Sequence, residues 1–254
     1  SAQNPAQVRI ANSATLPGDL VLNDLGSSAT CITCHNGRMA PANALSNGFP
    51  HYSTASENVL AVNAIDYDKY VFPSSPHNQV AHPVTEQTLC AMCHMAPTPG
   101  GPCEDDVVGG HTFAVSTDSG TPGDTTDDVV NLANACQVCH PSLTSLERTA
   151  AADYDGDGAT ESVQDEVGGL LAVLLAALET SGVEHVSHHP YWQGVTTDAQ
   201  RQAIYNFELV NHDGSGGIHN TRFSVAVLQA TYREFTGADV PGATIVYELQ
   251  STRR

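Results

Sequence analysis

Three five-residue motifs constrain this chain more than any other feature of its sequence. They are CITCH at 31–35, CAMCH at 90–94 and CQVCH at 136–140. In each motif two cysteines stand three positions apart, and a histidine follows the second cysteine directly. The motifs use six of the 7 cysteines. The remaining one is Cys103, for which we favour a buried thiol over a link to another chain.

The repeated histidine separates three interpretations of these cysteines. A redox-active CxxC needs no neighbouring histidine, and zinc held by two CxxC pairs would make the three histidines incidental. C-x-x-C-H is the attachment signature of c-type haem, in which the thiols add to the two vinyl groups and the histidine ligates the iron. We therefore predict three attached haems, with zinc and disulfides as alternatives. The residues concerned are Cys31, Cys34, His35, Cys90, Cys93, His94, Cys136, Cys139 and His140.

The supply of histidines indicates what would occupy the second axial position of each iron. The chain has 12 histidines against 9 lysines and arginines, and nine histidines remain when the three motif histidines are set aside. We interpret this excess as the source of a second histidine ligand for each of three irons. An iron held by two histidines exchanges electrons but has no open position for a substrate, so we do not expect an enzyme.

The charge of the chain limits its partners. With 9 basic and 28 acidic residues, the net charge is -19, which repels nucleic acid phosphates and anionic lipids. The longest strongly apolar run, 168–178, is shorter than the roughly 20 residues that a membrane span needs. Haem attachment of this kind takes place outside the cytoplasm, so we expect a secreted protein, extracellular or periplasmic, whose signal peptide has been removed.

The distribution of residue types predicts a mainly α-helical protein with much irregular loop, few or no strands and haem groups in its core. We expect three regions: an extended N-terminal arm at 1–30, a trihaem-binding region at 31–141 and a helical C-terminal region at 142–254. The middle region is rich in proline, glycine and small polar residues, and 117–128 is a polar loop. Such a stretch makes a poor apolar core by itself.

Helix signals are concentrated after residue 161. Ser162 and Asp165 form a capping box ahead of an apolar face that Gly182 can end. A second helix is expected after Thr197 or Asp198. A third helix is expected between Asn220 and Gly237, followed by a weakly alternating segment at 243–250 that fits a strand.

An acidic stretch, DYDGDGATESVQDE at 153–166, precedes the first of these helices. Its opening matches the D-x-D-x-D-G start of a calcium loop, but the twelfth position holds Gln164 where a glutamate is expected. The stretch is therefore either a calcium site or an acidic, solvated turn. The candidate calcium ligands are Asp153, Asp155, Asp157, Glu161 and Asp165.

The order of the motifs resembles a family of secreted multihaem c-type cytochromes, some of which assemble into extracellular filaments. The resemblance covers roughly 31–235 and rests on CITCHNGR, PHYS, SSPH, CAMCHMA, GGHTF, CQVCH, DYDGDG and YNFELVNHDGSGGIHN. It implies distal iron ligands among His77, His111, His219 and His51, which is one more than three irons need. The histidines less expected to be ligands are His82, His185, His188, His189 and His212, with the run 187–190 as a reserve.

The resemblance implies electron transfer through three bis-histidine haems, in a self-assembling filament or in a discrete soluble shuttle. The partners would be further copies of the chain, redox proteins or minerals. A nitrite-reductase-like enzyme is the least favoured alternative. Such enzymes carry a lysine-ligated haem, and the only lysine here, Lys69, lies outside any CxxC motif.

Overall fold

A computed structural model describes residues 12–46, 48–78, 89–98, 107–117, 128–187 and 191–250. Several positions singled out in the sequence lie outside these ranges. They are His82, Cys103, His188, His189, and all but the ends of the loop at 117–128.

The described part of the chain is mainly α-helical, as the sequence predicts. The long helices are α4 (Val163–Thr180), α5 (Asp198–Asn211) and α6 (Thr221–Thr236). The short helices are α1 (Ser28–Cys34), α2 (Ala55–Leu60), α3 (Leu89–His94), the 3-10 helices η1 (Pro41–Ser46), η2 (Pro76–Asn78) and η3 (Gly110–Thr112), and the π-helix η4 (Leu132–Cys136). Among the described helices, none is both long and apolar enough to cross a bilayer.

Strands are few and short, in agreement with the expected fold class. They pair as β1 (Ser13–Leu16) with β2 (Leu20–Asn23), β3 (Tyr70–Val71) with β8 (Glu248–Leu249), β4 (Ser116–Thr117) with β5 (Val129–Val130), and β6 (Glu184–His185) with β7 (Trp192–Gln193). The last three pairs are antiparallel. β8 lies within the tail segment 243–250, where the sequence suggests a strand.

Capping residues set the ends of the long helices. The Ser162 hydroxyl accepts a hydrogen bond from the Asp165 N–H at the start of α4, and Thr197 and Gln200 form a reciprocal capping box on α5. Asn220 caps α6, and Gly237 ends it with a φ of 84°. Each of these contacts satisfies backbone groups that a helix end otherwise leaves open, which explains why the predicted boundaries are confirmed.

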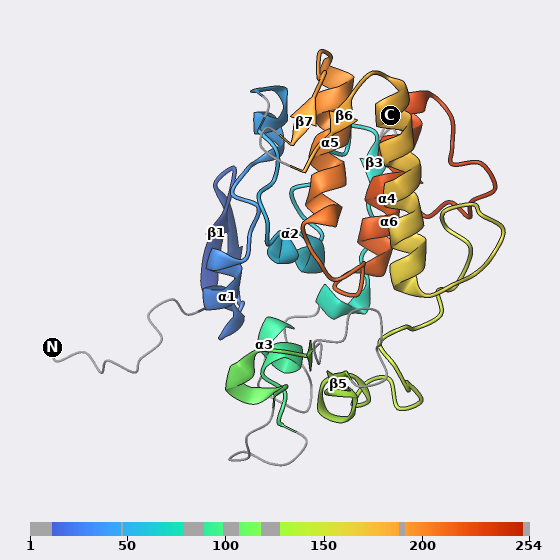
Figure 1. The fold of residues 1–254 in the computed structure, drawn as a ribbon. Coiled ribbons are helices and arrows are strands. Elements are labelled where there is room, and N and C mark those ends of the chain that lie inside the picture. Colours follow the sequence, from blue (N-terminus) through green and yellow to red (C-terminus); the bar gives the residue numbers. More distant parts are fainter. Residues whose placement is uncertain are drawn as a thin grey trace, which may run out of the picture. The chain divides into compact units, whose positions relative to one another are not determined.

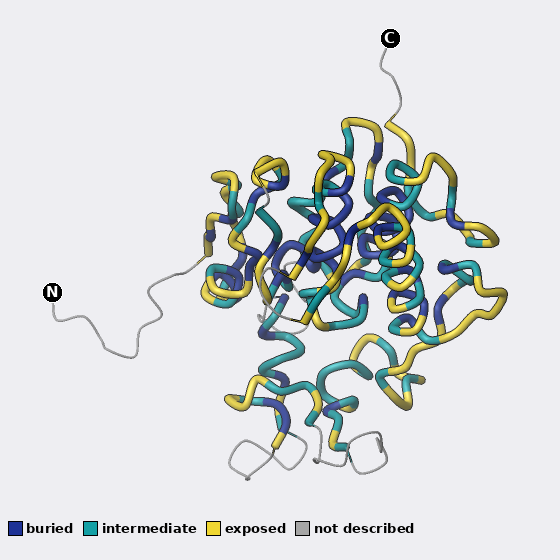
Figure 2. The backbone as a smooth tube through the Cα atoms, turned by 45° about the horizontal axis from the view of Figure 1, so that its top comes forward, coloured by how far each residue is buried: buried dark blue, intermediate teal, exposed yellow. Residues whose placement is uncertain are grey.

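The main core lies where α4, α5 and α6 pack against one another (Figure 1). Leu174, Ile204 and Val227 are each fully buried there, and the most deeply buried stretches of the chain follow these helices (Figure 2). Burial of such side chains stabilises the fold by about 1.5–3 kcal/mol each. Protein side chains therefore pack closely in the helical core of unit 2.

Packing divides the chain into two compact units that interleave in sequence. Unit 1 contains the described parts of Ser1–Ala14, Leu22–Cys31 and Gln79–Arg148. Unit 2 contains Thr15–Val21, Ile32–Asn78 and the described part of Thr149–Arg254. Residues 12–30, expected within an extended arm, form β1, β2 and the beginning of α1. The functional division at 1–30, 31–141 and 142–254 stays a prediction.

Candidate functional site

All three CxxCH motifs lie in helical turns. Cys31 and Cys34 belong to α1, and Cys90 and Cys93 belong to α3. In the third motif the Cys139 N–H donates to the Cys136 carbonyl at 3.1 Å, which continues η4 by a turn. Residues i and i+3 share one face of a helix, so this geometry presents the two thiols of each motif to the same side.

The thiols are available for chemistry. All six motif cysteines are free of disulfides, and each is at least partly exposed. The groups of three or more potential metal-ligand atoms found within 4.8 Å of one another, in the described part of the chain, are built from carboxylates alone. A structural zinc site needs four cysteine or histidine ligands around one ion, so the described thiols are not arranged as a zinc site.

Two thiols from different motifs meet inside unit 1. The Cys90 thiol forms a hydrogen bond with Cys31, and this bond lowers the pKa of Cys31 to about 6. The same contact, together with burial, raises the pKa of Cys90. A thiolate is the nucleophilic form of cysteine, so the contact makes Cys31 the more reactive of the pair.

Three of the expected iron ligands in the described part of the chain have their Nδ1 atom hydrogen-bonded to the protein. His94 Nδ1 donates to the Phe113 carbonyl at 2.9 Å in unit 1. In unit 2, His77 Nδ1 donates to the Ile218 carbonyl at 2.8 Å, and His219 Nδ1 lies 2.6 Å from Asp213 Oδ1. A carbonyl only accepts, so Nδ1 carries the proton and Nε2 carries the lone pair in the neutral ring. This arrangement is typical of histidines that bind a metal through Nε2.

His77 and His219 come from distant parts of the sequence, and Asn220 joins their segments. The Asn220 side chain accepts from the Ser75 N–H at 2.7 Å and donates to the Ser74 hydroxyl at 2.7 Å. Asn220 is fully buried and also caps α6. The sequence indicates Asn220 as the start of a helix but gives no sign that it also holds the His77 segment.

The loop between α5 and α6 places His219 beside a carboxylate that sequence reasoning missed. The side chain of Asp213 is only 1% exposed and accepts hydrogen bonds from His219 and from the Ser215 hydroxyl. Burial by itself lowers the pKa of His219, but the hydrogen bond and charge of Asp213 outweigh burial and raise the pKa above its ordinary value. Gly217, with a φ of 88°, is needed in this loop because a Cβ there would lie 2.7 Å from Val167 Cγ2.

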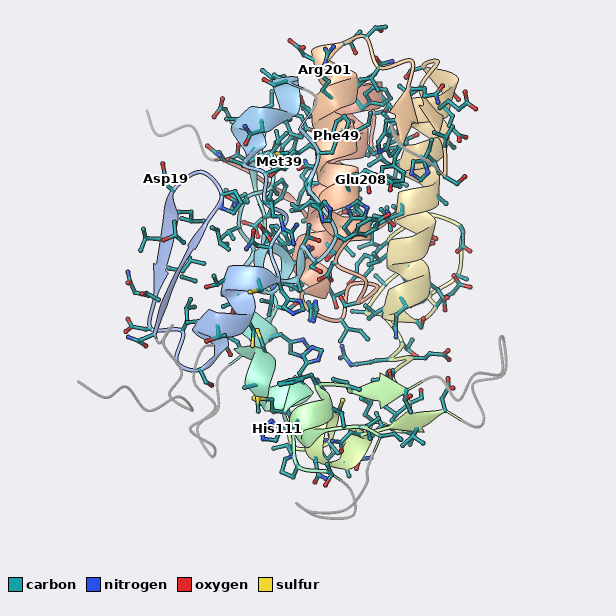
Figure 3. The ribbon with its side chains drawn as sticks, turned by 60° about the vertical axis from the view of Figure 1, so that its left-hand side comes forward. Asp19, Met39, Phe49, His111, Arg201 and Glu208 are labelled. Carbon is teal, nitrogen blue, oxygen red and sulfur yellow. The ribbon has the colours of Figure 1, made fainter. Side chains whose placement is uncertain are left out.

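Two other expected ligands lie on the surface. His51 is exposed, and its N–H donates to the Gly37 carbonyl at 2.8 Å, which holds it next to the CITCH motif. His111 is exposed in η3, with its ring edge-on to Phe113 at 6.3 Å (Figure 3). The structure therefore brings η2, which carries His77, into contact with the α5–α6 loop, which carries His219.

The motif histidines themselves are placed as follows. His35 is exposed directly after α1, and its carbonyl accepts from the Ser56 N–H at 3.0 Å. His140 is partly buried, and its N–H donates to the Cys136 carbonyl at 2.9 Å. Each thus stays within the turn that carries its own cysteines.

His212 and His185 make different contacts from these. His212 Nδ1 donates to the Pro50 carbonyl at 2.9 Å, while its Nε2 lies 3.1 Å from Oε2 of Glu208, a buried residue of α5 (Figure 3). A metal would have to displace one of these contacts. The ring of His185 packs against Trp192 with the centroids 4.5 Å apart.

Two buried polar atoms beside the motifs find no hydrogen-bond partner among the described residues. They are Oε2 of Glu57 and Oδ1 of Asn131. Glu57 Oε1 accepts from the N–H of Gly37, two positions after His35, and Asn131 directly precedes η4. Both atoms are hydrogen-bond acceptors, as is an ionised haem propionate, so they fit that group through a bridging water or a protonated carboxyl.

Backbone N–H groups of the acidic loop at 153–166 donate hydrogen bonds to the carboxylates of the same loop. Asp153, Asp155 and Glu166 form one group of neighbouring oxygens, and Asp155, Asp157 and Glu161 form another. Burial is the main cause that raises the pKa of Asp155, whereas the charge of Asp157 is the main cause that raises the pKa of Glu161. 

Asp165 belongs to neither carboxylate group, and its carboxylate accepts from the Ser162 hydroxyl at 2.6 Å. Fully buried Glu166, which the sequence did not single out, accepts from the Tyr154 N–H at 2.6 Å. The calcium site stays a prediction.

Comparison with known proteins adds one structural likeness. No family model and no curated protein matches the chain. The crystal structure of the outer cell wall cytochrome OcwA is similar with a TM-score of 0.49 and 20% sequence identity, over 86% of this chain. The chain spans 36% of the length of that cytochrome.

Proposed function

We propose that this chain is an electron carrier that holds three c-type haems, each ligated by two histidines. The observation that carries the proposal is the arrangement of the CxxCH motifs. Three times the chain places two thiols in one helical turn, outside any disulfide and followed by histidine. No other use of cysteine requires histidine at all three positions.

Different residues of the chain attach, ligate and orient the haems. The cysteine pairs anchor the three groups, and His35, His94 and His140 are the proximal ligands. Hydrogen bonds at Nδ1 orient the imidazoles of His94, His77 and His219 so that Nε2 can bind iron. When bound, haem supplies one-electron redox chemistry. The unpartnered oxygens of Glu57 and Asn131 can accept hydrogen bonds from a protonated propionate or from a water that bridges to haem.

The mass of the denatured chain tests haem attachment. We expect the acid-denatured protein to exceed the polypeptide mass by three haems, and the double variant Cys136→Ala/Cys139→Ala to exceed its polypeptide mass by two. Cys103→Ala is the matched control, because it removes a cysteine outside the motifs, and it should keep all three haems. A mass equal to the bare polypeptide would refute the proposal.

The absorption spectrum tests the second ligand. Two histidines on every iron give low-spin spectra that carbon monoxide leaves unchanged, because no axial position is open. An enzyme of the nitrite-reductase type would show a high-spin haem that binds carbon monoxide. That result would indicate that the protein is a catalyst and not an electron carrier.

We further propose that the protein works outside the cytoplasm and assembles with copies of itself into a filament. Several large apolar side chains are exposed, among them Val71 (48%) and Leu249 (67%) on the β3–β8 pair. Exposed apolar residues support contacts between copies, whereas the net charge of -19 opposes them unless cations are present. Negative-stain images separate the alternatives, since fibres support the filament and monodisperse particles support a soluble shuttle.

A further inference from the structure

The expected iron ligands with a described hydrogen bond at Nδ1 fall into two classes. His77 and His94 donate to backbone carbonyls, which are neutral acceptors. His219 instead faces the carboxylate of Asp213 at 2.6 Å. Among these three histidines, only His219 has a charged acceptor at Nδ1.

The carboxylate of Asp213 is built into the fold. Its side chain is 1% exposed, and it accepts a second hydrogen bond from the Ser215 hydroxyl. The Ser215 oxygen in turn accepts from the His219 backbone N–H at 3.2 Å. The three residues therefore form a closed set of contacts that fixes the ring of His219 and keeps water away from the carboxylate.

A hydrogen bond to a carboxylate changes the ligand more than one to a carbonyl does. The negative charge pulls on the Nδ1 proton and raises the electron density at Nε2, so the imidazole becomes a stronger donor. A stronger donor stabilises ferric over ferrous iron and lowers the reduction potential. Low dielectric around a buried carboxylate strengthens this effect.

We propose that Asp213 is a positioning residue that makes His219 a stronger donor than the carbonyl-bound His77 and His94, and that it lowers the reduction potential of the haem that His219 ligates. This inference rests on the proposed function, because it takes His219 as an iron ligand. It adds a direction to electron transfer, since three haems of unequal potential do not share an electron equally. The charge and contacts of the α5–α6 loop thus lower the potential of one of the three sites.

The variant Asp213→Asn tests the effect of charge while keeping the shape. The amide oxygen can still accept from His219 Nδ1, which converts His219 into the carbonyl-bound class of His77. In a spectrally resolved potentiometric titration of the haem-loaded protein, we expect one midpoint potential to rise and two to stay in place. The near-infrared magnetic circular dichroism band of one ferric haem should move as well, which a merely structural role would not produce.

A second variant acts on the same carboxylate from the other side. Ser215→Ala removes a hydroxyl that shares the charge of Asp213, so the carboxylate pulls harder on His219 and the same potential should fall. Glu179→Gln is the matched control, because it removes one negative charge from an exposed position of unit 2. Its effect measures the general influence of net charge.

The outcomes separate the inference from the proposed function. Unchanged potentials in Asp213→Asn, or an equal rise of all three as in Glu179→Gln, would overturn the inference. His219→Met tests the ligand assignment itself: if all three haems keep bis-histidine spectra, His219 is not a ligand. If the protein carries no haem, the proposed function fails before either question arises.

Discussion

The buried carboxyl of Glu57 provides a test of how burying an ionisable group affects the stability of this fold. The carboxyl is fully buried on α2, one oxygen accepts from the Gly37 N–H at 3.0 Å, and the other has no partner among the described residues. Burial is the main cause that raises the pKa of Glu57 from 4.5 to about 7. The charge of Asp213 contributes in the same direction.

The sign of the effect on stability follows from this pKa. Between pH 4.5 and about 7 the folded chain keeps a proton that the unfolded chain releases, so stability falls as pH rises through this range. Each unit of pKa difference corresponds to about 1.4 kcal/mol, so the full loss in the free energy of unfolding is about 3 kcal/mol and is reached near pH 8. At pH 5 the loss is below about 1 kcal/mol by the same relation.

Glu57→Gln removes the charge but keeps a group of the same shape that can accept from Gly37. Denaturant unfolding of the haem-loaded proteins at pH 5, 6.5 and 8 measures the difference. The free energy of unfolding of the variant, relative to that of the wild type, should rise by about 2–3 kcal/mol between pH 5 and pH 8. Glu147→Gln, at an exposed position, should show no such trend. Parallel stability curves for Glu57→Gln and the wild type would refute the reasoning.

Three further predictions concern caps and the acidic loop. Ser162→Ala removes the α4 cap and should lower the free energy of unfolding by about 1 kcal/mol, whereas no loss would mean that the cap is dispensable. Asn220→Ala also loses the bonds to the Ser74–Ser75 segment, so denaturant unfolding should show a loss of about 2–3 kcal/mol, and an effect no larger than that of Ser162→Ala would contradict the joining role. Calcium should raise the melting temperature of the wild type but not of Asp155→Asn, and equal shifts in both proteins would argue for an acidic turn without a site.

The helical part of the fold could be predicted because its signals are local. Ser162, Thr197, Asn220 and Gly237 cap helices through contacts a few residues away, and the apolar period continues between them. The strand in the tail was the weaker prediction, since β8 pairs with β3, which lies far away in the sequence.

The contacts that surround the expected ligands could not be predicted from the sequence. Asp213 lies six positions before His219, a spacing that no motif encodes, and it meets the ring only because the α5–α6 loop turns through Gly217. The bond from His77 to the Ile218 carbonyl spans 141 positions, and a backbone carbonyl has no signature in a sequence. Histidine candidates can thus be selected by their motifs, but their partners depend on tertiary structure.

The interleaving of the two units has a consequence for the order in which the chain acquires its structure. The Thr54 hydroxyl donates to the Leu209 carbonyl, 155 positions later, so the segment Ile32–Asn78 of unit 2 lacks this partner until α5 has been synthesised. The intervening stretch 79–148 belongs to the other unit and can complete its own contacts during that delay. Closing so long a loop costs entropy that grows only with the logarithm of its length, so the insertion of a second unit between Thr54 and α5 costs unit 2 little stability.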